Sequence, residues 1–173
     1  MASCSKLPNG GDPAAWGQYD MIYVFALLIG VVAGLRAFTA PAAVSWAAAI
    51  GWIDLSGTWA SFMGATITPW ILTLAALAEL VGDKLPNTPS RKVPMQFGAR
   101  VLMGAFSGAV LGLAGGEWIG GLAAGAVGAV IGTLGGAAVR ARLAAAFGRD
   151  LPAALIEDVV AIVAAILIVM SVT

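Results

Sequence analysis

The chain has 173 residues and no net formal charge, and it is 60 % hydrophobic and 10 % charged with a mean hydropathy of +0.94. A soluble domain is about 45–50 % apolar and about 25 % charged, so this composition excludes an ordinary soluble protein, and the neutral charge argues against nucleic acid as a partner. Because histidine is absent, imidazole-ligated haem or zinc and Ser–His catalysis are excluded as well.

Residues 1–20 are polar and rich in Gly and Pro, and they lack the charged, apolar and cleavage-site order of a signal peptide. We expect them to form a loose polar tail or a short interfacial segment. Residues 21–173 should form a single all-α transmembrane domain, since helices satisfy their backbone groups internally in lipid. The apolar blocks of this domain predict a bundle of about five transmembrane helices, the first of them broken. The blocks are residues 21–50, 63–81, 98–115, 118–139 and 156–172.

The first apolar block is interrupted by GLRAFTAP at residues 34–41. At 1.5 Å per residue, Arg36 lies roughly 22 Å along a helix that starts at Met21, inside a hydrocarbon core about 30 Å thick. Pro41 has no amide hydrogen, and it disfavours helical angles at the residue before it. The sequence therefore predicts a helix broken at Arg36–Pro41. A half-helix beginning near Pro41 would aim its amides at the same place as the guanidinium, which together would form an anion site.

Two roles are open for Arg36. An ionisable side chain at this depth is costly and is usually functional, which favours a ligand-binding role. The alternative is that Arg36 pairs with a carboxylate of another helix and only locks the bundle. The candidate carboxylates are Glu79 and Asp83, which share one helix face, and Glu157 and Asp158, which open the last block.

Basic residues concentrate in the predicted loops at 82–97 and 140–155, whereas the loops at 51–62 and 115–117 carry none. Because basic loops remain cytoplasmic, we expect both basic loops in the cytoplasm. Five crossings then place the N-terminus inside and the C-terminus outside. A six-segment alternative splits residues 21–50 into two membrane-dipping pieces and places the N-terminus outside, with the arginine of the break at a cytoplasmic turn.

Glycines recur every fourth residue along two of the predicted helices. Such stripes let helix backbones approach closely, so we expect a glycine zipper, either between these helices or against a neighbouring subunit of a homo-oligomer. A pore-lining role is the alternative. The stripes consist of Gly104, Gly108 and Gly112, of Gly121 and Gly125, and of Gly128, Gly132 and Gly136.

Two short elements of the first half recur in the second half. Gly-Leu-Arg at 34–36 resembles Gly-Ala-Arg at 98–100, and AALAE at 75–79 resembles AALIE at 153–157. An odd number of segments per half would make the halves, which join at residues 97–98, an inverted repeat. That architecture is typical of secondary transporters.

The segments GLRAFTAPAAVSWAA, ELVGDKLPNTPSR and GAR…GAFSGA, followed by R…ED, resemble a family of small bacterial inner-membrane proteins from about residue 21 onwards. That family is known only as a domain of unknown function (number four thousand one hundred and twenty-six). The resemblance implies a multi-pass protein of the bacterial inner membrane with no assigned activity. As architecture alone, a broken helix with arginine and proline in a duplicated bundle is also similar to bacterial carriers of undecaprenyl phosphate.

No catalytic constellation is recognisable, so we expect neither an enzyme nor a cofactor; a Mg²⁺ ion on one of the acidic pairs is the remaining alternative. The sequence predicts a membrane transporter for an anionic or phosphate-bearing solute or lipid, with a non-transporting accessory subunit and a channel as alternatives. The expected substrate-binding residues are Arg36, Thr39, Asn87 and Arg100. The expected ion-pairing or proton-coupling residues are Glu79, Asp83, Lys84, Glu157 and Asp158.

Overall fold

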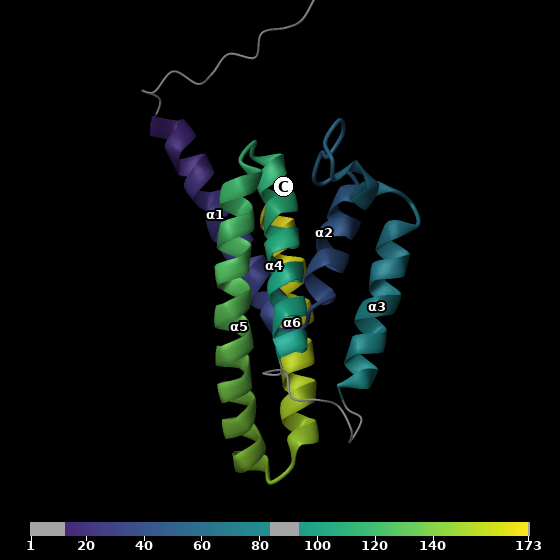
Figure 1. Ribbon diagram of the computed structural model, residues 1–173, viewed down its shortest axis with the longest axis vertical. Coiled ribbons are helices and arrows are strands. Elements are labelled where there is room, and N and C mark those ends of the chain that lie inside the picture. The colour runs from purple at the N-terminus through teal and green to yellow at the C-terminus, as the bar shows by residue number, and fades with distance from the viewer. Residues whose placement is uncertain (1–12, 84–93, 173) are drawn as a thin grey trace, which may run out of the picture.

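The computed structural model describes residues 13–83 and 94–172, with side chains from residue 21 onwards. This part of the chain is all-helical and contains no strand (Figure 1). Its elements are α1 (Pro13–Leu35), α2 (Thr39–Ala49), the 3-10 helix η1 (Ser61–Gly64), α3 (Thr68–Gly82), α4 (Pro94–Ala114), α5 (Trp118–Phe147) and α6 (Asp150–Ser171).

Three of these helices, α4, α5 and α6, are long and apolar enough to cross a membrane. The apolar part of α1 from Met21 and the whole of α3 are shorter, and α2 has 11 residues. Together with the composition, the three long helices support the predicted helical membrane protein. The predicted count of about five crossings is not confirmed.

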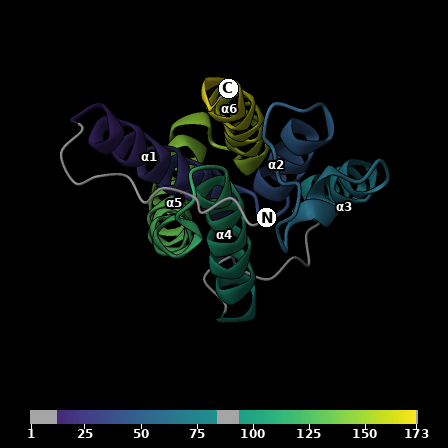
Figure 2. The same cartoon turned by 90° about the horizontal axis from the view of Figure 1, so that it is seen from above.

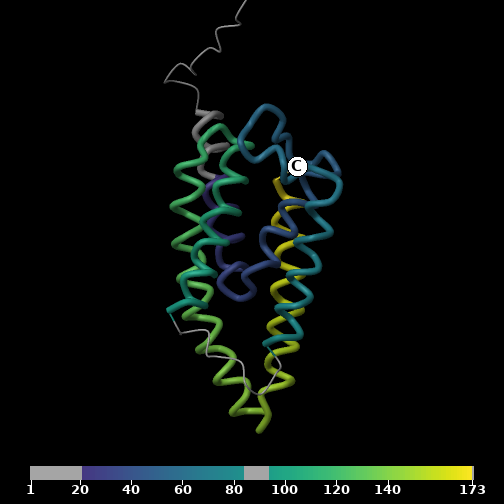
Figure 3. The backbone as a smooth tube through the Cα atoms, turned by 45° about the vertical axis from the view of Figure 1, so that its right-hand side comes forward, coloured from purple at the N-terminus to yellow at the C-terminus, as the bar shows by residue number. Residues whose placement is uncertain are grey.

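The first apolar block forms a hairpin and not a single broken crossing. Arg36, Ala37 and Phe38 leave the helix, and α2 then runs back toward the end at which α1 begins (Figure 3). Residue 171 lies at this same end, which also holds residues 50–67 and which we call the upper end (Figure 1). The lower end holds the turn between α5 and α6. Residues 21–50 are thus divided into two pieces, as in the six-segment alternative, but Arg36, which that alternative places at a cytoplasmic turn, is completely buried.

Pro41 is not at the break, contrary to the sequence-based expectation. It is the third residue of α2, within the first turn, where backbone N–H groups have no partner in the helix and proline is tolerated. Ala40, expected to leave helical angles, is helical. The amide of Ala42 donates to the carbonyl of Phe38 at 3.1 Å, so α2 starts directly after the break.

Two predicted boundaries are wrong because helices extend beyond the apolar blocks. α1 begins at Pro13, inside the predicted tail. α5 continues to Phe147 and α6 begins at Asp150, so most of the predicted loop at 140–155 is helical. The turn between them is made by Gly148, whose φ of 67° lies in the left-handed region that favours glycine.

Glycines bring α5 into near backbone contact with both α1 and α4 (Figure 2). A Cβ added to Gly108 would lie 2.3 Å from the carbonyl oxygen of Gly121, and one added to Gly132 would lie 2.2 Å from that of Val31. Neither position has room for a methyl group. At these positions the glycine stripes therefore contact other helices of the same chain.

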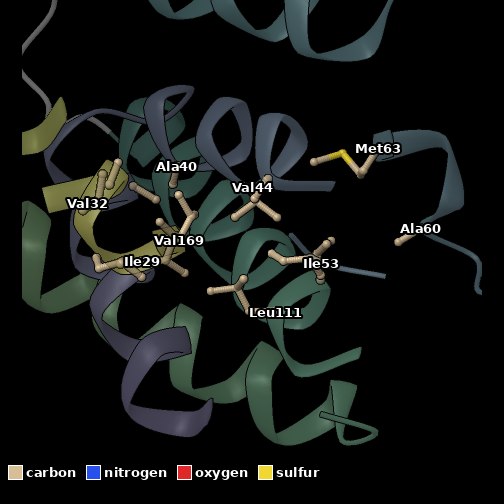
Figure 4. Close-up of a cluster of buried hydrophobic side chains, with 14 of the residues drawn as sticks. Ile29, Val32, Ala40, Val44, Ile53, Ala60, Met63, Leu111 and Val169 are labelled. Carbon is tan, nitrogen blue, oxygen red and sulfur yellow. The ribbon is translucent and has the colours of Figure 1, made fainter. Parts of the chain in front are cut away.

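A buried apolar core lies inside the bundle (Figure 4). Side chains from α1, α2, α4 and α6 pack there against the loop between α2 and α3, which folds inward. The loop contributes Ile53, Leu55, Ala60 and Met63, and the hydroxyl of Ser45 donates to the Met63 carbonyl at 2.6 Å.

Candidate functional site

Five of the predicted polar residues meet in one cluster at the break between α1 and α2. Arg36, at the break, forms ion pairs with Asp83, directly after α3, and with Asp158 of α6. Arg100 of α4 lies 3.3 Å from Glu79 of α3 and 3.6 Å from Asp83. These residues, which we call the ion cluster, join segments that are far apart in the sequence. Among them Arg36 is completely buried, with 0 % of its surface exposed.

The ion cluster lies inside the span of the bundle. The hydroxyl of Thr133 in α5 is 3.2 Å from the carbonyl oxygen of Gly34, which places the lower end of α1 level with Thr133. Thr133 follows Trp118 by fifteen residues, or roughly 22 Å of helix, whereas a hydrocarbon core is about 30 Å thick. A membrane core that starts at Trp118 would therefore contain the hairpin turn and its arginine.

The N-terminal end of α2 is occupied by a carboxylate of the chain itself. The amides of Ala37 and Phe38 donate to the two carboxylate oxygens of Glu79, at 2.8 and 2.9 Å. A helix N-terminus attracts negative charge through its partner-free N–H groups and its dipole. The break thus has the amide donors that the sequence predicts, and the anion on them is Glu79.

The C-terminal end of α1 is occupied by a cation. Arg100 donates to the carbonyl oxygens of Leu35 at 2.5 Å and Gly34 at 3.1 Å, and the Thr133 hydroxyl also bonds the carbonyl of Ala129 at 2.8 Å. A cation at a helix C-terminus satisfies carbonyls that have no helical partner. Since Glu79 and Arg100 also pair with each other, they hold the two ends of the hairpin turn together.

The ion cluster contains more carboxylates than arginines. Two guanidinium groups, of Arg36 and Arg100, face the three carboxylates of Glu79, Asp83 and Asp158. A buried charge is expensive in a medium of low dielectric constant unless an opposite charge compensates it.

A second ion pair lies toward the lower end. Arg140 of α5 donates to both carboxylate oxygens of Asp150 at 2.9 and 2.5 Å, and it lies 3.5 Å from Glu157. Glu157, expected to pair with one of the cluster arginines, is therefore next to Arg140. The sequence reasoning missed Arg140 because it was assigned to a loop, and it missed Thr133, whose signal was a lone hydroxyl in a glycine-rich helix.

The remaining predicted site residues are not all placed. Thr39 is buried at the first position of α2, beside the break. Lys84 and Asn87 lie outside the described residues. The predicted pairing of Arg36 with an acid of another helix is present, with Asp83 and Asp158 as its acids.

Two hollows flank the cluster at a distance. A polar hollow of about 570 Å³ opens at the upper end between the last turn of α2 and the following loop, lined in part by Asp54 and Ser61. An apolar hollow of about 320 Å³ lies between α1, α5 and α6, with Arg140 and Glu157 in its wall. The second hollow reaches Leu35, the residue before Arg36.

Comparisons with protein-family models, curated proteins and solved structures found no match to the chain. Within residues 13–83 and 94–172, no three or more Asp, Glu, Cys or His side chains form a group that could hold a metal ion.

Proposed function

We propose that the chain is a membrane transporter for an anionic or phosphate-bearing solute or lipid, and that the ion cluster is its binding site. The observation that carries this proposal is the carboxylate of Glu79 on the amides of Ala37 and Phe38. These amides and the nearby Arg100 make an anion site, and an internal anion occupies it. A diffusible anion that displaced Glu79 would meet the same donors.

Displacement of an internal carboxylate would couple anion binding to a proton. A carboxylate that loses its cationic partner in a low-dielectric site favours the protonated form, because burial disfavours the charged form. We therefore propose that the anion and about one proton bind together, with Glu79, Asp83 or Asp158 as the proton acceptor.

The course of the helices supports a transporter built from two inverted halves. α1, α2 and α3 run downward, upward and downward, and α4, α5 and α6 run in the opposite order of directions (Figure 1). The first helix of each half brings an arginine to the ion cluster, and the third brings carboxylates. Inverted repeats with a site at their interface are typical of alternating-access carriers. The basic residues Arg140, Arg142 and Arg149 favour a cytoplasmic lower end in a bacterial inner membrane.

A structural role is the second candidate, and the burial of Arg36 favours it. The guanidinium has 0 % exposure and pairs with carboxylates on both sides, from the end of α3 and from α6. Such a network could fix the hairpin without binding any ligand. This candidate predicts that charge-preserving changes alter stability alone, whereas the transport proposal predicts that they abolish a flux in a folded protein.

Flux measurements on reconstituted protein test the proposal. Vesicles containing the full chain and the pH dye pyranine would be mixed with inorganic phosphate or with dioctanoyl phosphatidic acid. We expect one of these probes to acidify the vesicle interior, and we expect Arg36→Lys to reduce the initial rate about tenfold or more with an unchanged unfolding temperature. Arg149→Gln, at an exposed position, is the matched control and should keep the wild-type rate. A folded protein that moves protons with neither probe would contradict the proposal and favour the structural role.

A further inference from the structure

The hairpin of α1 and α2 leaves an unfilled space beneath it. α1 stops at Leu35, whereas α5 continues to Phe147 and α6 begins at Asp150, well below the hairpin turn (Figure 3). The apolar hollow of about 320 Å³ lies between these two helices and the last turns of α1. Its position follows from the fold, because a helix that crossed completely would occupy part of this space.

The hollow is shaped by glycines and walled by branched apolar side chains. α5 contributes Gly132, Gly135 and Gly136, and the apolar walls include Val31, Leu35, Ile131, Val139, Ile156 and Val160. A Cβ added to Gly135 would meet no atom within 4 Å, whereas one added to Gly132 would lie 2.2 Å from the Val31 carbonyl oxygen. Gly132 therefore serves helix packing, and Gly135 borders open space.

Hydrocarbon is the occupant that suits this lining. Apolar cavities do not hold water, because a buried water needs polar partners. Burying apolar surface that is otherwise left unpacked gains dispersion contacts along the whole length of a chain. The walls are also partly exposed at the surface of the bundle, since Ile131, Val139 and Val160 are each about half exposed, so lipid chains can reach the hollow. An acyl chain thus fits the wall between Leu35 and Leu143.

A cation lies where the headgroup of such a lipid would be. Gly135, Val139 and Arg142 share one face of α5, because positions seven apart differ by about 20° around a helix. A core of about 30 Å that starts at Trp118 ends near residue 138, so Arg142 lies at the headgroup level. Arg142 is exposed, and no ion pair or hydrogen bond of its side chain is formed with other residues of the described chain.

We infer that the hollow between α1, α5 and α6 is a binding site for one acyl chain of an anionic phospholipid of the surrounding membrane, with the lipid phosphate at Arg142. The inference does not depend on transport, since a bound lipid of this kind would be present in a carrier and in a structural protein alike. It rests on the apolar lining, the open space at Gly135 and the exposed arginine on the same helix face.

Native mass spectrometry of the full chain in micelles tests this site with dioleoyl phosphatidylglycerol and dioleoyl phosphatidylcholine as probes. We expect one phosphatidylglycerol to bind about tenfold more tightly than phosphatidylcholine. Gly135→Leu should fill the hollow and reduce binding of both lipids about tenfold, and Arg142→Gln should make the two lipids bind equally. Gly98→Leu is the matched control, because a Cβ there also meets nothing within 4 Å and Gly98 is not part of the hollow.

The unfolding temperature of each variant shows whether it is folded, and Ile156→Trp provides a second way to fill the hollow if Gly135→Leu does not fold. Equal binding by wild type and Gly135→Leu would overturn the site, as would equal loss in Gly98→Leu. Equal affinity of the wild type for the two lipids would overturn the role of Arg142. None of these outcomes requires a flux measurement, so the lipid site and the proposed transport function are tested independently of each other.

Discussion

Replacing Arg36 by methionine removes the most deeply buried charge among the described residues while keeping a long, flexible side chain. The guanidinium is shared by Asp83 and Asp158, and of these Asp83 keeps Arg100 at 3.6 Å. Asp158 loses its contact with the arginine in a buried position. The variant therefore breaks a buried ion pair from one side only.

The expected cost is large on the scale of protein stability. Removing one partner of a buried ion pair destabilises a protein by about 3–5 kcal/mol, because the other charge stays buried. Total stabilities are about 5–15 kcal/mol. The double variant Arg36→Met/Asp158→Asn removes both charges and should recover about 2 kcal/mol of the loss, within the usual range for coupled neighbours.

Equilibrium unfolding in mixed micelles, followed by tryptophan fluorescence, measures these differences. Arg149→Met is the control, since a substitution at this exposed position should stay within about 0.5 kcal/mol of wild type. The reasoning is refuted if Arg36→Met lies within about 1 kcal/mol of wild type, or if the double variant is no more stable than the single one.

Three further outcomes are expected. Glu79→Gln weakens the internal competitor for the amides of the break, so the chain should bind inorganic phosphate or dioctanoyl phosphatidic acid about tenfold more tightly in calorimetry; weaker binding would count against competition. Gly125→Ala places a methyl group 2.2 Å from a backbone oxygen of α4 and should lower the free energy of unfolding by about 1–3 kcal/mol or more. Gly135→Ala, in the same unfolding assay, should leave the free energy of unfolding unchanged or raise it by up to about 1 kcal/mol. The hydroxyl and amide of Ser56 hold the pKa of Asp54 below its ordinary value of 3.8. The ionised carboxylate therefore stabilises the folded loop above pH 3.8, and this stabilisation is lost as the pH falls through the lowered pKa. Ser56→Ala should raise the pKa of Asp54 toward 3.8 in an NMR titration, and an unchanged pKa would contradict the bond.

The position of the break could be predicted from the sequence because its signals are local. A cation and a proline in an apolar block mark a place where a regular membrane helix is unfavourable. The direction of the chain after the break was not predictable in this way. α2 turns back because Glu79 and Arg100 occupy the two helix ends, and these contacts bridge more than 40 residues of sequence.

The partners within the site were predicted as a set but not as pairs. Apolar-block lengths and helical spacing placed Glu79 and Asp83 on one face, and the structure brings both to the break. Which carboxylate binds the amides and which pairs with Arg36 depends on the position of α3 along the bundle axis relative to the hairpin. Tertiary packing sets this position. Arg140 was misplaced for a related reason, because α5 extends past the apolar block from which its end was estimated.

In the proposed mechanism, carboxylates of the ion cluster and a diffusible anion compete for the same donors. Calorimetric titration with inorganic phosphate and dioctanoyl phosphatidic acid, repeated in buffers of different ionisation enthalpy, measures anion binding and the protons taken up with it. We expect one probe to bind with uptake of about one proton, and we expect Arg36→Lys to abolish both signals in a folded chain. Absence of binding by either probe, or binding without proton uptake, would contradict it.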